Sequence, residues 1–265
     1  MKSRNLILGV TLVAMLSGCG SVPLTGRKQL MLVSDSEVLS SSLTQYNEYI
    51  RTATKSSSAT QTAMVKRVGQ KIAAATEQYL RQSGMSAEIK NYSWEFNLIK
   101  DKQINAFCMP GGKIVVYEGL MNLVSSDDEL AVVIGHEVAH AVAKHSNERM
   151  SQQNAAQYGS SILSAALSEK STMVKNIAGT VYGLGAQYGV MLPFSRTHEL
   201  EADYMGLVFM TIAGYNPDVA VTFWQKMSAS SGGSVPEILS THPSDEHRIT
   251  EIKKALAEIK AGMKK

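Results

Sequence analysis

The chain of 265 residues has few cysteines, few aromatic residues and almost no net charge. Its two cysteines cannot build a disulfide framework or a four-cysteine zinc site. The 26 Lys and Arg residues against 23 Asp and Glu residues give a net charge of +3, which argues against nucleic-acid binding through a basic surface. The hydrophobic share of 44% is typical of one medium-sized globular domain with a sizeable core.

The N-terminal segment has the layout of a secretory signal. Lys2 and Arg4 precede an apolar run over 6–15, and the run ends at Leu-Ser-Gly-Cys over 16–19. An uncleaved transmembrane anchor is the alternative, but the run is shorter than the roughly 20 residues that span a bilayer. The tetrapeptide resembles a bacterial lipobox, which implies a signal peptide over residues 1–18 and a lipid on Cys19. The expected location is the bacterial cell envelope, at the outer membrane and facing the periplasm.

The mature chain divides into a lipidated tether over 19–42 and one domain over 43–265. Helical periodicity extends to about residue 84, followed by alternating apolar residues in three short runs around a Gly-Gly turn at 111–112, which predicts a small antiparallel sheet. Further helices are expected at 197–213, 217–229 and 244–261. The fold class is therefore α+β and mainly helical.

Two helical regions are expected in the middle of the domain. Ser126 and Glu129 form a capping box that predicts a helix running to about Met150. The stretch over 154–193 is rich in Ala, Ser and Gly, with no charge over 176–195. Its glycines and polar residues favour packed helices over a transmembrane hairpin.

The pattern His136-Glu137-Val138-Ala139-His140 lies inside the helix that the capping box begins. Residues four apart share one helix face, so both imidazoles can bind one zinc ion at about 2.0–2.1 Å. Glu137 projects beside the ion, within reach of a zinc-bound water whose proton it can take. The pattern predicts metal-assisted hydrolysis with one Zn²⁺ per chain and Glu137 as the catalytic base.

A catalytic zinc needs a third protein ligand and one open position. The segment over 195–203 predicts another helix, on which Glu199 and Asp203 share a face because they are four residues apart. We expect Glu199 to bind zinc and Asp203 to accept the remaining N–H of a ligand histidine. Glu201 points about 200° away from Glu199, which favours a solvated carboxylate.

These two motifs resemble those of the zinc metallopeptidases that include HtpX, the CAAX prenyl protease and the mitochondrial Oma-type protease. Three further stretches agree with that family, at 105–107 with 110–112, at 192–196, and at 241–243 with Arg248. The resemblance spans about residues 104–252 and implies a zincin-type domain of the gluzincin kind, similar to soluble lipoproteins of bacterial envelopes. It implies the zinc ligands His136, His140 and Glu199 and the base Glu137.

The resemblance also implies roles around the metal. The family's late His-Pro motif lies near the metal, so we expect His242 to be a catalytic hydrogen-bond donor to the developing oxyanion. A histidine that only caps a helix start ahead of Pro243 is the alternative. Arg196 and Arg248 are expected to pair with carboxylates around the site.

The strand that carries Asn105, Ala106 and Phe107 is expected to lie at a sheet edge that borders the active site. An extended peptide can bind such an edge through main-chain hydrogen bonds, which favours unfolded substrates. The leading hypothesis is a zinc-dependent endopeptidase that cuts unfolded or misfolded envelope proteins.

The alternative function is a periplasmic chaperone or assembly factor for outer-membrane proteins with latent or low protease activity. Envelope assembly machinery is the partner expected in that case. In a latent enzyme, the uncharged segment over 176–195 covers the cleft until a partner or substrate moves it.

Overall fold

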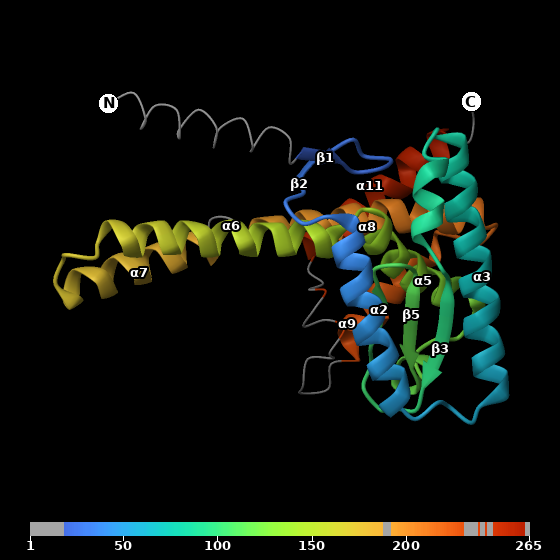
Figure 1. The fold of residues 1–265 in the computed structure, drawn as a ribbon. Coiled ribbons are helices and arrows are strands. Elements are labelled where there is room, and N and C mark those ends of the chain that lie inside the picture. The colour runs from blue at the N-terminus through green and yellow to red at the C-terminus, as the bar shows by residue number, and fades with distance from the viewer. Residues whose placement is uncertain (1–18, 188–191, 231–237, 239–241, 243–245, 263–265) are drawn as a thin grey trace. The chain divides into compact units, whose positions relative to one another are not determined.

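The computed structural model describes residues 19–187, 192–230, 238, 242 and 246–262 (Figure 1). The predicted signal peptide over 1–18 therefore lies outside the described residues. The chain divides into two compact units. The first unit comprises Met1–Val38 and Lys144–Ser195, and the second comprises Leu39–Ala143 and Arg196–Lys265.

The first unit begins with a hairpin of β1 (Cys19–Ser21) and β2 (Lys28–Leu30), which pair antiparallel. The region expected to be a tether therefore has regular structure, and α2 (Asp35–Thr52) already begins within it. Arg27 binds Glu148 through two hydrogen bonds of 3.0 and 2.7 Å. These contacts fix the N-terminal segment to the helix α6 (His145–Ala166).

The helices α6 and α7 (Thr172–Ala186) also belong to the first unit. No helix among the described residues is long and apolar enough to cross a membrane. The stretch is helical as expected, but no residue of α7 is buried. Packing of α7 into a domain core, as the sequence predicts, is not what the structure shows.

The second unit is built on a sheet of β3 (Glu95–Ile99), β4 (Ala106–Met109) and β5 (Lys113–Tyr117), in the order β3-β5-β4. The strands β4 and β5 form the expected antiparallel hairpin, whose turn holds Gly111 and Gly112 at φ of 92° and 81°. The strand β3, however, pairs with β5 in parallel, so the prediction of an antiparallel sheet is wrong for this pair. The chain reverses direction on each side of β4, and two reversals make β5 parallel to β3.

Helices cover both faces of this sheet, and Figure 1 shows β3 and β5 running between α2 and α3 (Ala59–Gln82). On one face, Tyr46 of α2 packs against Ile99 and Val115. On the other face, the ring of Phe96 lies so close to Gly69 of α3 that a Cβ there would be 2.2 Å from it. The sheet is therefore the middle layer of three.

The remaining elements are mostly helical, which confirms the mainly helical α+β class. A short 3-10 helix, η1 (Ser86–Asn91), follows α3, and α4 (Glu118–Met121) follows β5. The helices α8 (Leu192–Ile212), α9 (Val219–Ala229) and α11 (Glu246–Gly262) match the three predicted C-terminal helices within a few residues at most ends.

The helix α5 (Asp127–Val142) begins at the predicted cap, where the Ser126 hydroxyl accepts from the Glu129 N–H at 3.2 Å. It ends eight residues before the predicted end. Lys144 takes a left-handed conformation with φ of 56°, and α6 starts directly after it. No glycine or proline marks this break in the sequence, so the sequence pattern predicts one continuous helix where the structure has two.

A pair of glycines brings α5 and α8 into backbone contact. A Cβ on Gly206 of α8 would lie 2.8 Å from the backbone nitrogen of His136, and one on Gly135 of α5 would lie 3.0 Å from the Gly206 carbonyl oxygen. These two helices carry the His-Glu-x-x-His motif and Glu199. Close approach at the glycines therefore sets the separation of the predicted ligands.

Substitution of Gly206 by alanine tests this helix crossing. The added methyl group meets backbone rather than a flexible side chain, so we expect the free energy of unfolding to fall by about 1–3 kcal/mol. Urea-induced unfolding measures the change. Gly179→Ala on α7 is the control, because its Cβ has nothing within 4 Å and alanine favours helix by up to about 1 kcal/mol. Equal stability of the two variants would contradict the crossing.

Candidate metal centre

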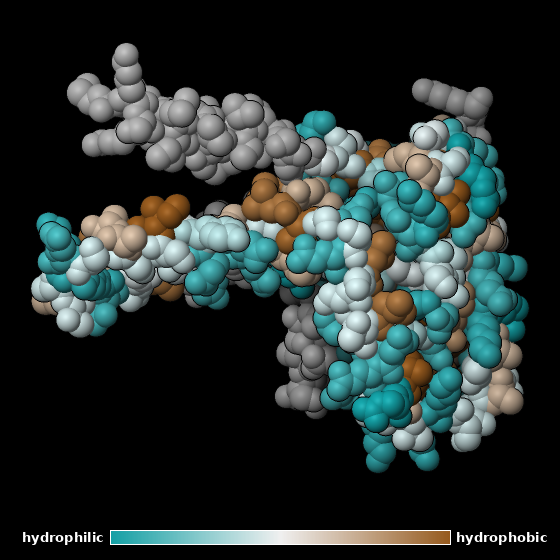
Figure 2. Space-filling view, viewed as in Figure 1, coloured by the Kyte–Doolittle hydropathy of each residue, from teal (hydrophilic) through white to brown (hydrophobic). Residues whose placement is uncertain are grey.

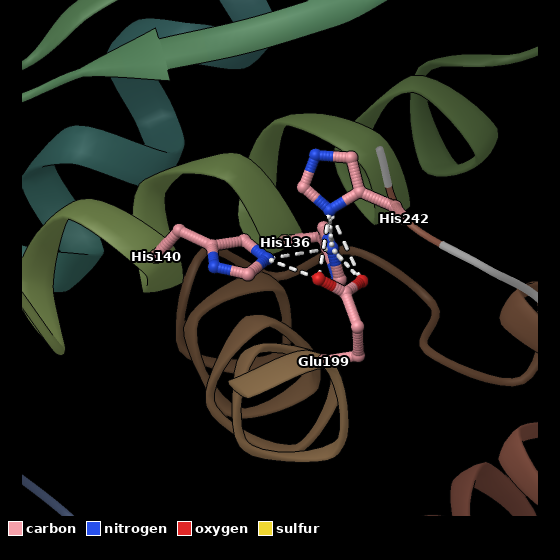
Figure 3. A group of neighbouring side chains, drawn as sticks. All are labelled: His136, His140, Glu199 and His242. Carbon is pink, nitrogen blue, oxygen red and sulfur yellow. Dashed lines mark hydrogen bonds and ion pairs between the residues drawn. The ribbon is translucent and has the colours of Figure 1, made fainter. Parts of the chain in front are cut away.

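Four side chains converge on one point in the second unit, as Figure 3 shows. They are His136, His140, Glu199 and His242, and one ligand atom from each lies within 4.8 Å of the others. The two Nε2 atoms of His136 and His140 are 3.0 Å apart, and Nδ1 of His242 lies 3.0 Å from both Glu199 oxygens. Ligand atoms of a tetrahedral zinc site are about 3.3 Å apart, so these spacings suit one ion.

The donor set and one orphaned atom also fit a divalent metal. Imidazole nitrogens and a carboxylate are the ligands that zinc takes in hydrolases. Beside them, Oε1 of Glu137 is buried without a hydrogen-bond partner, although buried polar atoms nearly always have one. A bound ion with its water would satisfy the converging lone pairs and this oxygen together.

Helix spacing places the ligands and the groups behind them. His136 and His140 lie one turn apart on α5, and Glu199 and Asp203 lie one turn apart on α8. Oδ1 of Asp203 lies 2.9 Å from Nδ1 of His136. A proton held on Nδ1 leaves the Nε2 lone pair directed at the centre, which is the role expected for Asp203.

Arg248 is a buried cation that pairs with a carboxylate behind the candidate ligands. It is 2% exposed, and its Nε and Nη2 bind the two oxygens of Asp203 at 2.6 and 2.8 Å. Its guanidinium also lies 4.2 Å from the centroid of the Trp224 ring. The expected pairing with a site carboxylate is therefore present for Arg248. Arg196, in contrast, is exposed and forms no ion pair within the described part of the chain, so the prediction for Arg196 is wrong.

The electrostatics of the four-residue cluster favour a cation. Burial opposes ionisation of Glu199, but hydrogen bonds from three histidines hold its pKa far below the usual range. Burial likewise raises the pKa of Asp203, and the charge and hydrogen bonds of Arg248 lower it further than burial raises it. Burial and the Arg248 charge oppose protonation of His136, yet hydrogen bonds to Asp203 and Glu199 raise its pKa to about 9. The carboxylates are therefore ionised around the position of the ion.

Glu137 lies beside the ligands and next to the sheet. It is 2% exposed, and its Oε2 accepts a hydrogen bond of 3.2 Å from the backbone N–H of Cys108 on β4. Its Oε1 lies 3.6 Å from Nε2 of His242. The predicted base is therefore held between the metal position and the edge strand.

The strand β4 lies at one edge of the sheet, as expected, but its residues have different roles. The N–H of Tyr117 donates to the Asn105 carbonyl at 3.1 Å. Because antiparallel pairs alternate, Asn105 and Phe107 direct their main-chain groups toward β5, and Ala106 and Cys108 direct theirs outward. The Phe107 ring also packs edge-on against Tyr117. Ala106 is thus the one of the three predicted residues whose main chain faces away from the sheet.

The interior of α8 corrects a further expectation. Glu201 is only 6% exposed, so the solvated carboxylate predicted there is wrong. Helical rotation turns Glu201 away from the metal as predicted, but α8 is surrounded by the domain, with Ala202, Met205 and Phe209 all buried. Only the three-dimensional packing shows that the far side of this helix is also covered.

Two histidines and a carboxylate on crossing helices, with a second carboxylate beside them, define a zincin-type metal hydrolase. The chain belongs to Peptidase family M48, whose family model matches residues 59–256.

Curated relatives agree with this family. The chain is 38% identical over 178 residues to the mitochondrial metalloendopeptidase OMA1 of Schizosaccharomyces pombe, covering 66% of this chain and 49% of that protein. It is 40% identical over 163 residues to OMA1 of Arabidopsis thaliana, covering 62% and 32%. It is 32% identical over 186 residues to the beta-barrel assembly-enhancing protease of Escherichia coli, covering 66% and 37%. The chain thus spans about a third to a half of the length of these relatives.

The position of His242 generates a prediction about metal binding. The oxyanion-donor role requires a side chain beside the ligands, whereas Nδ1 of His242 lies among them, 3.2 Å from Nε2 of His136. We expect His242→Ala to weaken zinc affinity at least about tenfold, since even partners behind the ligands contribute that much. Competition titration with a zinc chelator measures the change, with His247→Ala, an exposed histidine, as the control. Unchanged affinity with a lower kcat would favour the oxyanion role instead.

Proposed function

We propose that this protein is a zinc-dependent endopeptidase that hydrolyses peptide bonds in unfolded or misfolded proteins of the bacterial cell envelope. The observation that carries the proposal is the cluster of ligand atoms with the Glu137 carboxylate beside it. Membership of a peptidase family and similarity to metalloendopeptidases support the reaction type.

Glu137 is the residue of this chain that moves the proton. When bound, zinc supplies Lewis-acid chemistry, lowering the pKa of water and polarising the peptide carbonyl. Glu137 takes the proton of the attacking water on Oε1 and later delivers it to the leaving amine, so that the C–N bond breaks without a free anion. The Cys108 N–H donates a hydrogen bond to the other oxygen, Oε2, and thereby leaves Oε1 to face the attacking water.

The edge of β4 is the proposed binding site for substrate. Ala106 directs its main-chain N–H and C=O away from β5, two residues from the N–H that binds Glu137. The residue is 1% exposed, so a substrate strand reaches this edge only after the edge is uncovered. A peptide that adds to this edge as an extra strand is held by its main chain. Such binding depends little on the side chains of the substrate and requires an extended chain, which supports unfolded proteins as the substrate class.

The envelope location rests on the lipobox at 16–19. A lipid on Cys19 would anchor the protein to a membrane, and the export signal directs it to the periplasmic side; we assign it to the outer membrane. The similarity to a protease named for β-barrel assembly supports unfolded envelope proteins as substrates and envelope assembly machinery as a partner.

One observation favours the alternative of an assembly factor with latent protease activity. A hydrolytic zinc keeps one coordination position open. In this structure Nδ1 of His242 lies 3.0 Å from Oε1 of Glu199 and 3.2 Å from Nε2 of His136. These distances are those between neighbouring ligand atoms of one ion, so four protein side chains surround the ion position. This arrangement describes a closed centre, and hydrolysis requires that His242 leave it.

Replacement of Glu137 by glutamine tests the endopeptidase. We expect one zinc per chain in the parent and in Glu137→Gln, with cleavage of unfolded casein reduced at least about a hundredfold in the variant, because general-base catalysis contributes about 10²–10⁴-fold. Glu258→Gln, an exposed position of α11, is the control. Full cleavage by Glu137→Gln would contradict the mechanism. Zinc without cleavage in the parent, together with cleavage by His242→Ala, would favour latency.

Replacement of Ala106 by proline tests the binding edge. Proline removes the outward N–H while leaving the hydrogen bonds to β5 in place, which edge strands tolerate. Loss of one hydrogen bond of about 0.5–1.5 kcal/mol should raise KM for casein peptides by about 2–10-fold with little change in kcat. Ala106→Gly, which keeps the N–H, is the control. An unchanged KM in a folded Ala106→Pro protein would show that substrate binds elsewhere.

A further inference from the structure

The helix α7 is turned with its polar face toward α6. The Tyr182 hydroxyl donates to the carbonyl of Ala156 at 3.0 Å, and Lys175 Nζ donates to the carbonyl of Ser168 at 2.6 Å. Gly179 lines a small cavity together with side chains of α6. Lys175, Gly179 and Tyr182 recur at steps of four and three, so they mark one face of α7.

The opposite face of α7 is apolar and exposed. Met173, Ile177, Val181 and Leu184 recur at steps of four, four and three and lie about 160–240° from Lys175 around the helix. Their exposed fractions are 72%, 54%, 66% and 50%. We refer to these four residues as the apolar stripe. Figure 2 shows hydrophobic residues at the surface of the α6–α7 pair, and eight of the ten exposed large hydrophobic residues in the described chain belong to it.

Exposure of the apolar stripe to water is unfavourable, and a surface that covers the stripe would remove that exposure. Burying large aliphatic side chains is favourable, and helices of this length are marginal in water without a packed apolar face. No residue of α7 is buried. A surface that covers the stripe is therefore expected to stabilise the helix.

The composition around the stripe suits lipid better than protein. Residues 150–187 contain only three charges, at Glu169, Lys170 and Lys175, and the first two lie in the turn between the helices. A face of α7 is about 22 Å long and 10 Å wide, which offers on the order of a few hundred Å². That is well below the roughly 800 Å² per partner of a stable dimer.

The first unit also contains the residue expected to carry the lipid. Cys19 opens β1, and Arg27 at the other side of that hairpin binds Glu148 of α6. Ser151, one turn further along α6, accepts from the N–H of Leu32 at 2.9 Å. An anchor at Cys19 therefore holds α6, and α7 packed on it, close to a membrane.

We infer that the apolar stripe of α7 is a membrane-docking surface that lies in the interfacial layer of a lipid bilayer. The helix lies on the bilayer and does not span it, with Met173, Ile177, Val181 and Leu184 in contact with acyl chains. The anchored position of Cys19 rests on the proposed envelope location, but the stripe itself binds lipid without the acylated cysteine. Attachment at two points fixes the orientation of the first unit at the surface, which one flexible anchor cannot do.

The test uses the chain from residue 19 with Cys19→Ser, so that no lipid is attached. We expect it to float with vesicles of phosphatidylethanolamine and phosphatidylglycerol, and at high salt, because the contact is apolar. Ile177→Glu with Val181→Glu, one turn apart on the stripe, should lower the bound fraction at least about tenfold. Thr172→Glu with Asn176→Glu, also one turn apart and exposed but off the stripe, should bind like the parent.

Four results would overturn the inference. A parent that does not float, or equal loss of binding in both pairs of variants, shows that the stripe does not dock on lipid. A parent dimer in sedimentation that only the 177/181 variant dissociates shows that a second copy covers it. Faster casein cleavage by that variant without vesicle binding by the parent shows that the stripe covers the active site. If the parent cleaves casein but does not float, the proposed protease activity stands and the docking surface fails. If the parent floats but does not cleave casein, the docking surface stands and the proposed protease activity fails.

Discussion

The buried contact between Arg248 and Asp203 is the interaction on which the metal centre depends. It joins α11 to α8 through two hydrogen bonds, and Asp203 in turn contacts His136 of α5. Breaking one partner of such a pair leaves an uncompensated buried charge that costs about 3–5 kcal/mol. Here the guanidinium also lies 3.3 Å from Glu199, so it offsets the repulsion between two buried carboxylates. Without Arg248, the buried carboxylates of Glu199 and Asp203 would lose the cation that pairs with both of them.

The same cation also contacts the backbone of His242. Nη1 of Arg248 donates to the backbone carbonyl of His242 at 3.1 Å, while the His242 ring lies among the ligand atoms. Arg248 therefore contacts both Asp203, which hydrogen-bonds His136, and the backbone of His242, the fourth residue of the cluster. In the proposed enzyme, opening has to displace the His242 ring while the pairing of Arg248 with Asp203 persists. The closed arrangement and the catalytic arrangement then differ in one side chain rather than in the framework of three helices.

Local spacing predicts the parts of the centre that a single helix determines. Pairs four residues apart place His136 with His140 and Glu199 with Asp203, because an α-helix has little freedom in that geometry. Packing between elements decides the rest, and there the sequence predictions fail. The parallel pairing of β3 with β5, the left-handed residue Lys144 and the burial of Glu201 leave no local signal. The sequence predicts that both Arg196 and Arg248 pair with site carboxylates, and the path of α11, which local sequence does not determine, brings Arg248 to Asp203.

The orientation of helix α7 likewise cannot be predicted from its sequence. Its periodicity predicts which residues share a side, but not which side meets the protein. The structure puts Tyr182 against α6 and leaves the apolar stripe outside. A peptidase that holds substrate by the main chain of Ala106 selects extended chains and reads little of their sequence. Its selectivity must then come from where it is held, and two attachments to a membrane would restrict it to unfolded chains that emerge at that surface.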